Sequence, residues 1–308
     1  MIGLTYGNFQ SGAGFVGLLD TYPNAAAAYS LRLLKSDYAG ALVEIAGYTT
    51  TPTFVENRAF LPDANNKLSL TSQDVGLTTT LNDWITNNSI TDGYVRTWYD
   101  QSGNGVNATQ TSASAQPQII NGGSFILKNN RPTIEFNGTT NYLRFNTYTG
   151  NNSQFHVVDN FAQSASFTRL LFFTASNLNT NFAKGTVAKY NTGSNYLFLS
   201  TNSEIGTATT TTAFPQDHLL ISILPDEAEN TPLAYQNGSL TSKTNSDTPR
   251  PSAAGTYSYI GARKRGDDSG VIDSLADFDY QEIIIYSSDE TANRVEIENN
   301  INLFYSIY

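Results

Sequence analysis

The chain has 308 residues and contains no cysteine, which excludes disulfide bonds, thiolate zinc sites and cysteine nucleophiles. It has two histidines, His156 and His218, which lie far apart in the sequence and belong to no motif. We interpret both as structural and expect no metal site built from several histidines. Charged residues make up only 14% of the chain, and the formal net charge is −10. This balance argues against a nucleic-acid partner, because proteins that bind the phosphate backbone need a basic face.

Long apolar stretches are also missing. No run approaches the ~18 consecutive apolar residues of a membrane span, so we expect none. The first twenty residues lack a charged start and a continuous apolar segment, so we expect no signal peptide. The sequence thus gives no sign of a membrane span or of a signal peptide. Its polar and aromatic residues are the remaining source of information about function.

Aromatic residues are abundant: they form 12% of the chain, with 18 Tyr and 17 Phe. With many Thr, Ser, Asn and Gly residues, this composition is typical of a β-rich protein with many turns. Turn pairs between short apolar runs predict hairpins at Asn121–Gly123, Asn137–Gly138 and Asn237–Gly238. The apolar run within Glu282–Tyr286 predicts a strand buried on both faces.

Three segments have helical patterns. We expect helices over Asp20–Lys35, over Ser72–Asn87 and near the C-terminus, where Ser287 and Glu290 fit a capping box and Tyr308 falls on the apolar stripe. About a dozen or more short strands with regular turns accompany them, a pattern typical of an antiparallel sandwich. The predicted fold is therefore mainly β, with about three peripheral helices.

The stretch Gly93–Gln110 begins as a strand and then turns sharply at Gln-Ser-Gly-Asn-Gly. Its aromatic residues are candidates for stacking on sugar rings, although their alternation along a strand favours packing in the core or against loops. These candidates are Tyr94, Trp98 and Tyr99.

The turn itself has the spacing of a calcium loop. Asp100, Ser102, Asn104 and Gly105 occupy its first, third, fifth and sixth positions, so alternating oxygens could converge on Ca²⁺. The twelfth position is Thr111 instead of a bidentate Glu. We therefore favour a turn in which Asp100 and Asn104 bond backbone amides, with no metal and no other cofactor, and keep calcium as the alternative.

A second polar pattern, D-x-D-x-x-E, is formed by Asp277, Asp279 and Glu282. A retaining glycosidase needs two carboxyl groups about 5–5.5 Å apart. Asp277 and Asp279 would share one face of a strand, and Glu282 would join that face only if a bulge intervenes. The alternative is a polar beginning to a buried strand, and we favour it over catalysis.

Several segments resemble known modules. The front of the chain carries LLDTYPNAAAAYSLRLLKSDYAGALVEI, WYDQSGNGVNATQ and RPTIEFNGTTNYLRF. It resembles a module of bacteriophage and bacterial proteins and the front of the fungal arabinofuranosidase B catalytic domain, which shares a YDQSGNG-type loop. The second half carries PLAYQNGSL, SYIGARKRG and DFDYQEIIIYSSDETANRVEIENNINLFYSIY, and it is similar to the laminin G or concanavalin A-like jelly roll. The resemblance implies one jelly-roll domain over 20–308, with a front part at 20–150 and a laminin G-like part at 151–308.

These observations lead to a functional hypothesis. We expect a non-enzymatic structural or adhesive component on the outer surface of a virion, associated with capsid or tail, that binds host surface glycans weakly. Residues 1–19 would form an arm that docks on another virion protein, and the chain would form homo-oligomers. Two alternatives stay open: a glycoside hydrolase or polysaccharide depolymerase, and a calcium-dependent lectin.

Overall fold

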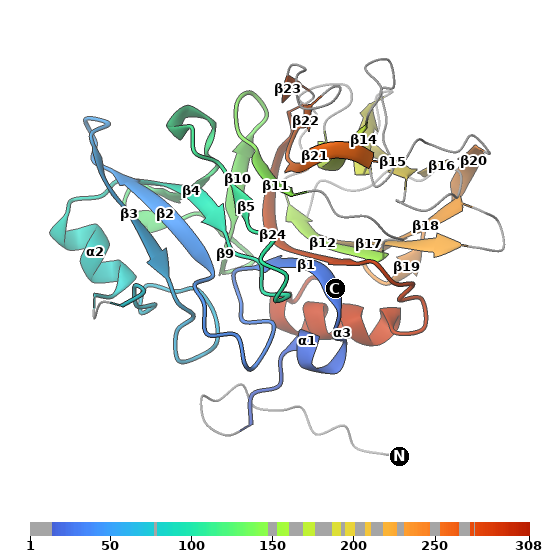
Figure 1. The fold of residues 1–308 in the computed structure, drawn as a ribbon, viewed down its shortest axis with the longest axis horizontal. Helices are drawn as coiled ribbons and strands as arrows, with labels where there is room; N and C mark the ends of the chain where they lie inside the picture. The colour runs from blue at the N-terminus through green and yellow to red at the C-terminus, as the bar shows by residue number, and fades with distance from the viewer. Residues whose placement is uncertain are drawn as a thin grey trace.

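The computed structural model describes residues 14–76, 79–146, 153–159, 169–175, 187–191, 195–200, 207–210, 218–226, 231–246, 253–264, 272–273 and 275–308. Within these ranges the chain is mainly β, with antiparallel strands in two packed layers (Figure 1). The expected β-sandwich is therefore confirmed. The described part of the chain contains no helix long and apolar enough to cross a membrane.

The first layer follows from the strand pairings. It runs in the order β3 (Phe54–Phe60), β2 (Val43–Tyr48), β4 (Asp92–Trp98), β6 (Gln118–Asn121), β10 (Ile134–Asn137), β24 (Asp277–Tyr286), β12 (Ser153–Asp159), β17 (Leu219–Asp226), β18 (Thr231–Gln236) and β19 (Ser239–Leu240). Strand β24 is the centre of this layer. On one edge it pairs with β10 and then with β1 (Ala25–Ser30), and on the other edge it pairs with β12.

The second layer is connected to the first through β5 (Ala108–Thr109), which pairs with β4 and also with β11. It continues in the order β11 (Leu143–Asn146), β21 (Ala253–Ile260), β13 (Arg169–Ala175), β14 (Val187–Asn191), β15 (Asn195–Ser200), β16 (Thr207–Thr210) and β20 (Lys243–Ser246). Shorter pairs join β6 to β7 (Ser124–Phe125), β8 (Leu127–Lys128) to β9 (Arg131–Pro132), and β22 (Arg263–Lys264) to β23 (Ile272–Asp273).

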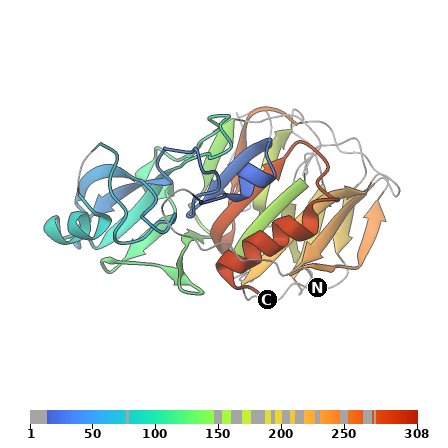
Figure 2. The ribbon, with the colours of Figure 1, turned by 90° about the horizontal axis from the view of Figure 1, so that it is seen from below.

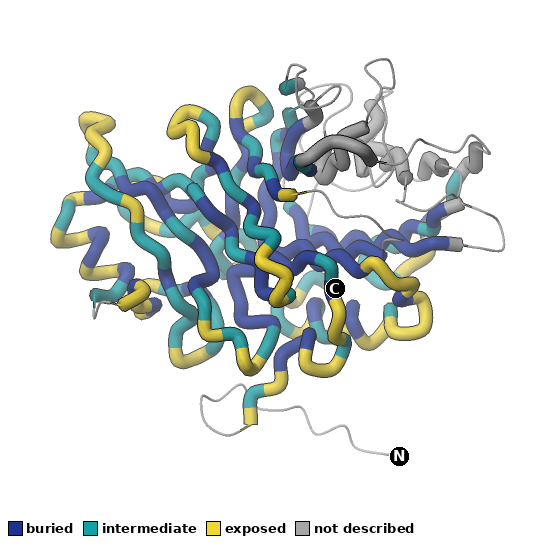
Figure 3. Tube along the Cα trace, in the orientation of Figure 1, coloured by how far each residue is buried: buried dark blue, intermediate teal, exposed yellow. Residues whose placement is uncertain are grey.

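The main core lies between the two layers. Trp98, Phe136 and Tyr280 of the first layer are buried together with Phe145 and Ile260 of the second. The central strands of the first layer are buried along much of their length, whereas the edge strand β3 and the loops at the strand ends are more exposed (Figure 3). Burial of these large aromatic side chains, together with that of the aliphatic residues around them, supplies the apolar area that stabilises the fold.

Helix α3 (Arg294–Tyr305) covers part of the outer face of the first layer (Figure 2). Its Ile297 and Ile301 pack with Phe155 of β12 and with Ile284 and Tyr286 of β24. The expected capping box is wrong, because Glu290 instead accepts hydrogen bonds from Ser288 and Asn293 and the helix begins after it. Tyr308 lies beyond the helix, since the left-handed backbone of Ser306 (φ 54°) ends it.

The predicted helix over Asp20–Lys35 is wrong. Only Leu18–Thr21 is helical (α1), and Ala25–Ser30 is strand β1, which pairs with β24. Pro23 and the left-handed Asn24 (φ 68°) separate the two elements. The alanines are good helix formers, but here their small side chains allow a strand to lie buried against β24, and tertiary packing overrides propensity.

The predicted helix over Ser72–Asn87 is shorter than expected. Helix α2 spans Leu81–Asn87, and it begins there because the Thr80 hydroxyl accepts a hydrogen bond from the Asp83 amide. An additional 3-10 turn, η1, spans Ala113–Ala115.

Two of the three predicted hairpins are confirmed. Gly122 and Gly123, both with positive φ, connect β6 and β7, and Asn237–Gly238 connects β18 and β19. The hairpin at Asn137–Gly138 is wrong, because β10 pairs with β6 and β24 whereas β11 belongs to the second layer.

Candidate functional site

The segment Asp100–Val106, which we call the Asp100 loop, covers the free edge of strand β1. One edge of β1 pairs with β24, and the other meets the loop, where the Gln101 amide donates to the Ala28 carbonyl (2.8 Å). The Gln101 side chain is also buried: its Oε1 accepts from the Leu34 amide (2.8 Å) and its Nε2 donates to the Ser30 carbonyl (3.1 Å). The loop therefore satisfies backbone groups that an uncovered strand edge would leave unpaired.

Asp100 uses all of its hydrogen-bonding capacity inside the protein. Its Oδ1 accepts from the amides of Ala28 and Ser102, both at 2.9 Å. Its Oδ2 accepts from the Ser102 hydroxyl (2.7 Å) and the Val106 amide (3.1 Å). Since a carboxylate has about four acceptor positions, none is left over for a cation. The expected turn is confirmed for Asp100.

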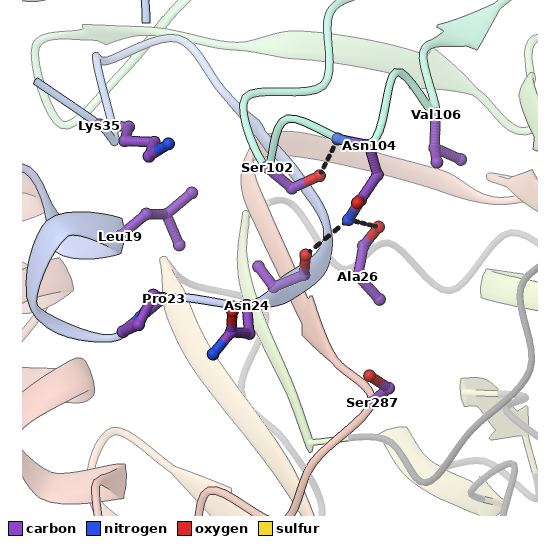
Figure 4. Close-up of a pocket in the computed structure, with 10 residues that line it drawn as sticks. Leu19, Pro23, Asn24, Ala26, Lys35, Ser102, Asn104, Val106 and Ser287 are labelled. Atoms are coloured by element: carbon purple, nitrogen blue, oxygen red, sulfur yellow. Dashed lines mark hydrogen bonds between the residues drawn. The ribbon is translucent and has the colours of Figure 1, made fainter. Parts of the chain in front are cut away.

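Asn104 differs from the expectation. Its Nδ2 donates to the carbonyls of Ala25 (2.9 Å) and Ala26 (3.1 Å) instead of its oxygen accepting from amides (Figure 4). The reason is that β1 presents carbonyl groups at this point, which sequence spacing does not show. A hollow of about 500 Å³ lies beside the loop and is lined by Ser102, Asn104 and Lys35 among others. On the loop side, the Ser102 hydroxyl and Asn104 Nδ2 already form hydrogen bonds with the protein.

The favoured absence of a metal at the Asp100 loop stays a prediction, with calcium as its alternative. No group of three or more His, Asp or Glu residues in the described ranges could hold a metal ion. The three calcium candidates, Asp100, Ser102 and Asn104, are held together by hydrogen bonds among themselves and to β1.

The three candidate carboxylates of β24, Asp277, Asp279 and Glu282, lie in different environments. Glu282 is 0% exposed beneath α3, where its Oε2 and Oε1 accept from Nε (2.8 Å) and Nη2 (2.9 Å) of Arg32. Ser30 donates a further hydrogen bond to the same carboxylate (2.7 Å). The pairing register shifts between Tyr280 and Glu282, so the bulge that Glu282 needs in order to join the face of Asp279 is present. Glu282 is nevertheless committed to a buried ion pair that joins β1, β24 and α3.

Asp277 and Asp279 lie closer to the beginning of β24. Asp277 pairs with Asn137 and is partly exposed, whereas Asp279 is 1% exposed. Lys128 Nζ lies 3.2 Å from Asp279 Oδ2 and 3.8 Å from Asp159 Oδ1. Removal from water raises the pKa of Asp279 to about 7, a rise that Glu135 and Asp159 increase and Lys128 opposes.

Pairing places these acids in one transverse row. Directly paired residues of antiparallel strands point to the same face of a sheet. The registers join Tyr94 of β4 to Gln118 of β6, Gln118 to Glu135 of β10, Glu135 to Asp279 of β24, and Asp279 to Asp159 of β12. The row therefore leads from an aromatic residue at one end into the buried Asp279–Lys128 ion pair.

A cleft of about 440 Å³ opens at the Tyr94 end of this row, and we call it the Tyr94 cleft. Tyr48 and Tyr94 stand edge to face in it, with ring centroids 5.6 Å apart. Burial and the neighbouring Asp92 raise the pKa of Tyr94, so its hydroxyl keeps its proton and can donate. The lining residues are Tyr48, Pro52, Asp92, Tyr94, Ala113, Ser114, Gln116, Gln118, Glu135, Asn137, Thr140 and Asn141.

Several polar atoms of this lining have no partner within the described chain. Gln116 is 3% exposed, and its Oε1 is buried without a hydrogen bond, although its Nε2 donates to the Gln110 carbonyl (2.8 Å). Gln118 Nε2 donates to Asp92 Oδ1 (3.0 Å), which orients the amide and leaves its oxygen as an acceptor. A buried acceptor without a partner is costly unless water or a ligand supplies a donor. The cleft is thus prepared for a ligand with hydrogen-bond donors.

The three predicted sugar-stacking residues separate in the structure. Tyr94 lines the cleft. Trp98 is fully buried in the core, with its ring centroid 5.7 Å from that of Tyr29. Tyr99 is half-buried and lies near Glu44 and Arg96, outside the lining of the cleft.

Both histidines occupy structural positions, as we expected. His156 is fully buried, with Nδ1 2.8 Å from the Tyr280 hydroxyl and Nε2 3.1 Å from Gln154 Oε1, and burial lowers its pKa to about 3. His218 Nε2 lies 2.7 Å from Gln281 Oε1.

Tyr48, Gln116, Gln118 and Glu135 are among the cleft residues that were not predicted from the sequence. They come from separate segments, and the pairing of β2, β4, β6 and β10 brings these segments together. The sequence signal that could have pointed to them is the polar side chain alternating with buried apolar ones, as Glu135 does between Ile134 and Phe136.

No protein-family model matches the chain, and no curated protein matches it. Among solved structures, it is similar to an arabinofuranosidase complexed with arabinofuranosyl-alpha-1,2-xylobiose, at 16% identity and a TM-score of 0.55 over 90% of this chain. It is equally similar to a GH54 α-L-arabinofuranosidase soaked with a cyclic sulfate inhibitor, at 16% identity and a TM-score of 0.55. The chain spans 62% of the length of each of these proteins, and the likeness shows a shared fold alone.

Proposed function

We propose that the chain is a carbohydrate-binding β-sandwich and that the Tyr94 cleft holds the glycan. The observation that carries this proposal is the combination of Tyr48 and Tyr94 with the unpartnered acceptor Gln116 Oε1 in one cleft. An aromatic face covers the apolar side of a sugar ring, and fixed acceptors bind its hydroxyls. The fold shared with arabinofuranosidases, one of which is complexed with an arabinofuranosyl-xylobiose, supports a glycan as the class of ligand.

The test is binding to a glycan array, followed by calorimetry on the best ligand. Tyr94→Ala should weaken binding by roughly tenfold or more, because aromatic contacts of this kind contribute ~1–2 kcal/mol. Tyr99→Ala is the matched control, since Tyr99 follows on the same stretch but lies outside the cleft lining. Equal affinity of wild type and Tyr94→Ala for the ligand would contradict the proposal.

In the same proposal the sandwich is displayed on the outer surface of a virion and binds a host surface glycan there. The resemblance of its front segments to a bacteriophage module supports this placement. Leu18 and Leu19 pack into the chain's own α3 cluster, so an arm that docks on another virion protein would end before them. Residues 1–13 of that arm lie outside the described ranges. Antibody labelling of intact particles tests the placement, and sedimentation of the purified chain tests the expected homo-oligomer.

A glycoside hydrolase is the second candidate. It is favoured by one observation, the direct pairing of Glu135 with Asp279, whose pKa of about 7 is that of a usable general acid. Incubation with arabinan and with capsular polysaccharides should release reducing ends if this candidate is right. Activity that both Asp279→Asn and Glu135→Gln abolish would establish the hydrolase over a binding protein.

A further inference from the structure

The charged groups of the Tyr94 cleft indicate which class of glycan can bind there. Among the residues that the structure describes, its lining contains two carboxylates, Asp92 and Glu135, and no lysine or arginine. Asp92 already accepts from Gln118 Nε2 (3.0 Å) and from the Thr91 hydroxyl (2.9 Å). Glu135 has no hydrogen-bond partner within the described residues, so its carboxylate is available to a ligand.

The cation beside the transverse row, Lys128, compensates Glu135 only in part, because Glu135 contributes least of the three acids that raise the pKa of Lys128. Lys128 Nζ is held by Asp279 (3.2 Å) and Asp159 (3.8 Å), deeper along the row. Within the described residues, this row contains no second cation that could offset Glu135. A second anion placed in the cleft would therefore meet like charge at short range, in partly buried surroundings where screening is weak.

The uncharged groups point in the same direction. Gln116 Oε1 is a buried acceptor without a donor, and Gln118 presents its oxygen because its nitrogen is used by Asp92 and by the Ile120 carbonyl. Sugar hydroxyls are donors and match these acceptors, whereas carboxylate and sulfate groups are acceptors only and do not.

We infer that the Tyr94 cleft is selective for neutral, hydroxyl-rich glycans and rejects glycans that carry carboxylate or sulfate groups. This inference rests on the proposed function and names its ligand class. Glu135 is the selectivity residue: it accepts hydroxyl hydrogen bonds from a neutral sugar and repels an anionic one.

The experiment uses pairs of oligosaccharides that differ only in charge. Hexose oligomers of the gluco, galacto and manno series are each compared with the counterpart oxidised to the uronic acid at C6. Affinities are measured by calorimetry for the full chain and for Glu135→Gln, Gln116→Leu and Tyr94→Ala, with the melting temperature of each variant recorded to show that it is folded.

We expect the neutral member of the best-binding pair to bind at least roughly tenfold more tightly than its uronate, a ratio that added salt reduces. Glu135→Gln should bring the ratio close to about one while keeping the fold, and Gln116→Leu should weaken the neutral ligand without restoring the uronate. Uronates that bind as well as the neutral sugars, or a ratio that Glu135→Gln leaves unchanged, would overturn the inference while leaving the proposed function in place. If Tyr94→Ala binds every sugar as tightly as the wild type does, that result would contradict the proposed function itself.

Discussion

In the Asp100 loop, both oxygens of Asp100 accept two hydrogen bonds each from the protein, whereas in the Tyr94 cleft the buried Gln116 Oε1 accepts none from the residues that the structure describes. Both regions are built from amides and carboxylates at strand ends, and both border a hollow of similar size. They differ in whether the polar groups are already paired. Paired groups stabilise the fold, and unpaired groups are what a ligand can use.

The comparison also separates two kinds of motif. The Asp100 loop is the more conspicuous in the sequence, yet its oxygens and amides hold strand β1 in place. The cleft has no conspicuous sequence pattern, because its residues come from β2, β4, β6, β10 and the loops beside them. A noticeable polar motif is therefore weak evidence of a binding site until its hydrogen bonds have been accounted for.

The largest effect should come from the loop. Asp100→Ala leaves the amides of Ala28, Ser102 and Val106 without their acceptor, and we expect the free energy of unfolding to fall by about 3 kcal/mol or more. Urea unfolding followed by tryptophan fluorescence measures this loss. Ser102→Ala, which removes only one donor to Asp100, is the milder control. A loss below about 1 kcal/mol for Asp100→Ala would remove the distinction between the two regions.

The second largest effect should be a change in how stability depends on pH, and it should come from Asp279 at the buried end of the transverse row. The folded chain keeps a proton on Asp279 up to about pH 7, and the unfolded chain releases it near 3.8, so this group's contribution to stability falls as pH rises between those values. His156, with its pKa lowered to about 3 by burial, has the opposite effect: its contribution falls as pH decreases below 6.5.

Between about pH 4 and 6.5, the titration of Asp279 lowers stability as pH rises, whereas the titration of His156 raises it. Asp279→Asn removes the first titration, so the melting temperature of the variant should rise with pH through this window more steeply than that of the wild type. Scanning fluorimetry at fixed ionic strength from pH 4 to 8 measures the difference, which should be largest near pH 7. Parallel profiles for the two proteins would show that Asp279 titrates normally.

A smaller effect on the free energy of unfolding is expected for a substitution in the Tyr94 cleft. Glu135 makes no hydrogen bond within the described chain and is only partly buried, so Glu135→Gln should change the free energy of unfolding by less than about 0.5 kcal/mol. The same urea experiment measures it. A loss comparable to that of Asp100→Ala would mean that the cleft, too, is a structural cluster.

The smallest effect is expected from chelation. Because the protein occupies the acceptor positions of Asp100, EDTA should shift the melting temperature by less than about 1 °C, and added Ca²⁺ should not raise it. A rise that depends on the calcium concentration would favour the calcium-dependent lectin.

Local sequence chemistry predicted the sandwich class and the turns at Gly122–Gly123 and Asn237–Gly238. These features depend on backbone preferences of a few neighbouring residues. Strand β1 was wrongly predicted to be helical because its conformation depends on β24 and the Asp100 loop, both far away in the sequence. The hairpin at Asn137–Gly138 failed for the same reason, since β10 finds its partners in β6 and β24.

The candidate site could be predicted only in part. Tyr94 was one of three aromatic candidates for which packing was the favoured interpretation. Its neighbours Gln118 and Glu135 depend on the register of three strands that no local pattern specifies. The burial of Glu282 by Arg32 likewise depends on a contact between residues 250 positions apart.

The position of β24 has a consequence for biosynthesis. Strands β1, β10 and β12 all depend on it, and Ser30 of β1 bonds Glu282 of β24 across 252 residues of chain. A nascent chain therefore exposes the unpaired edges of these strands until β24 has been translated, a state in which aggregation competes with folding. Any fragment expressed without β24 should collect in inclusion bodies, however carefully its boundaries are chosen.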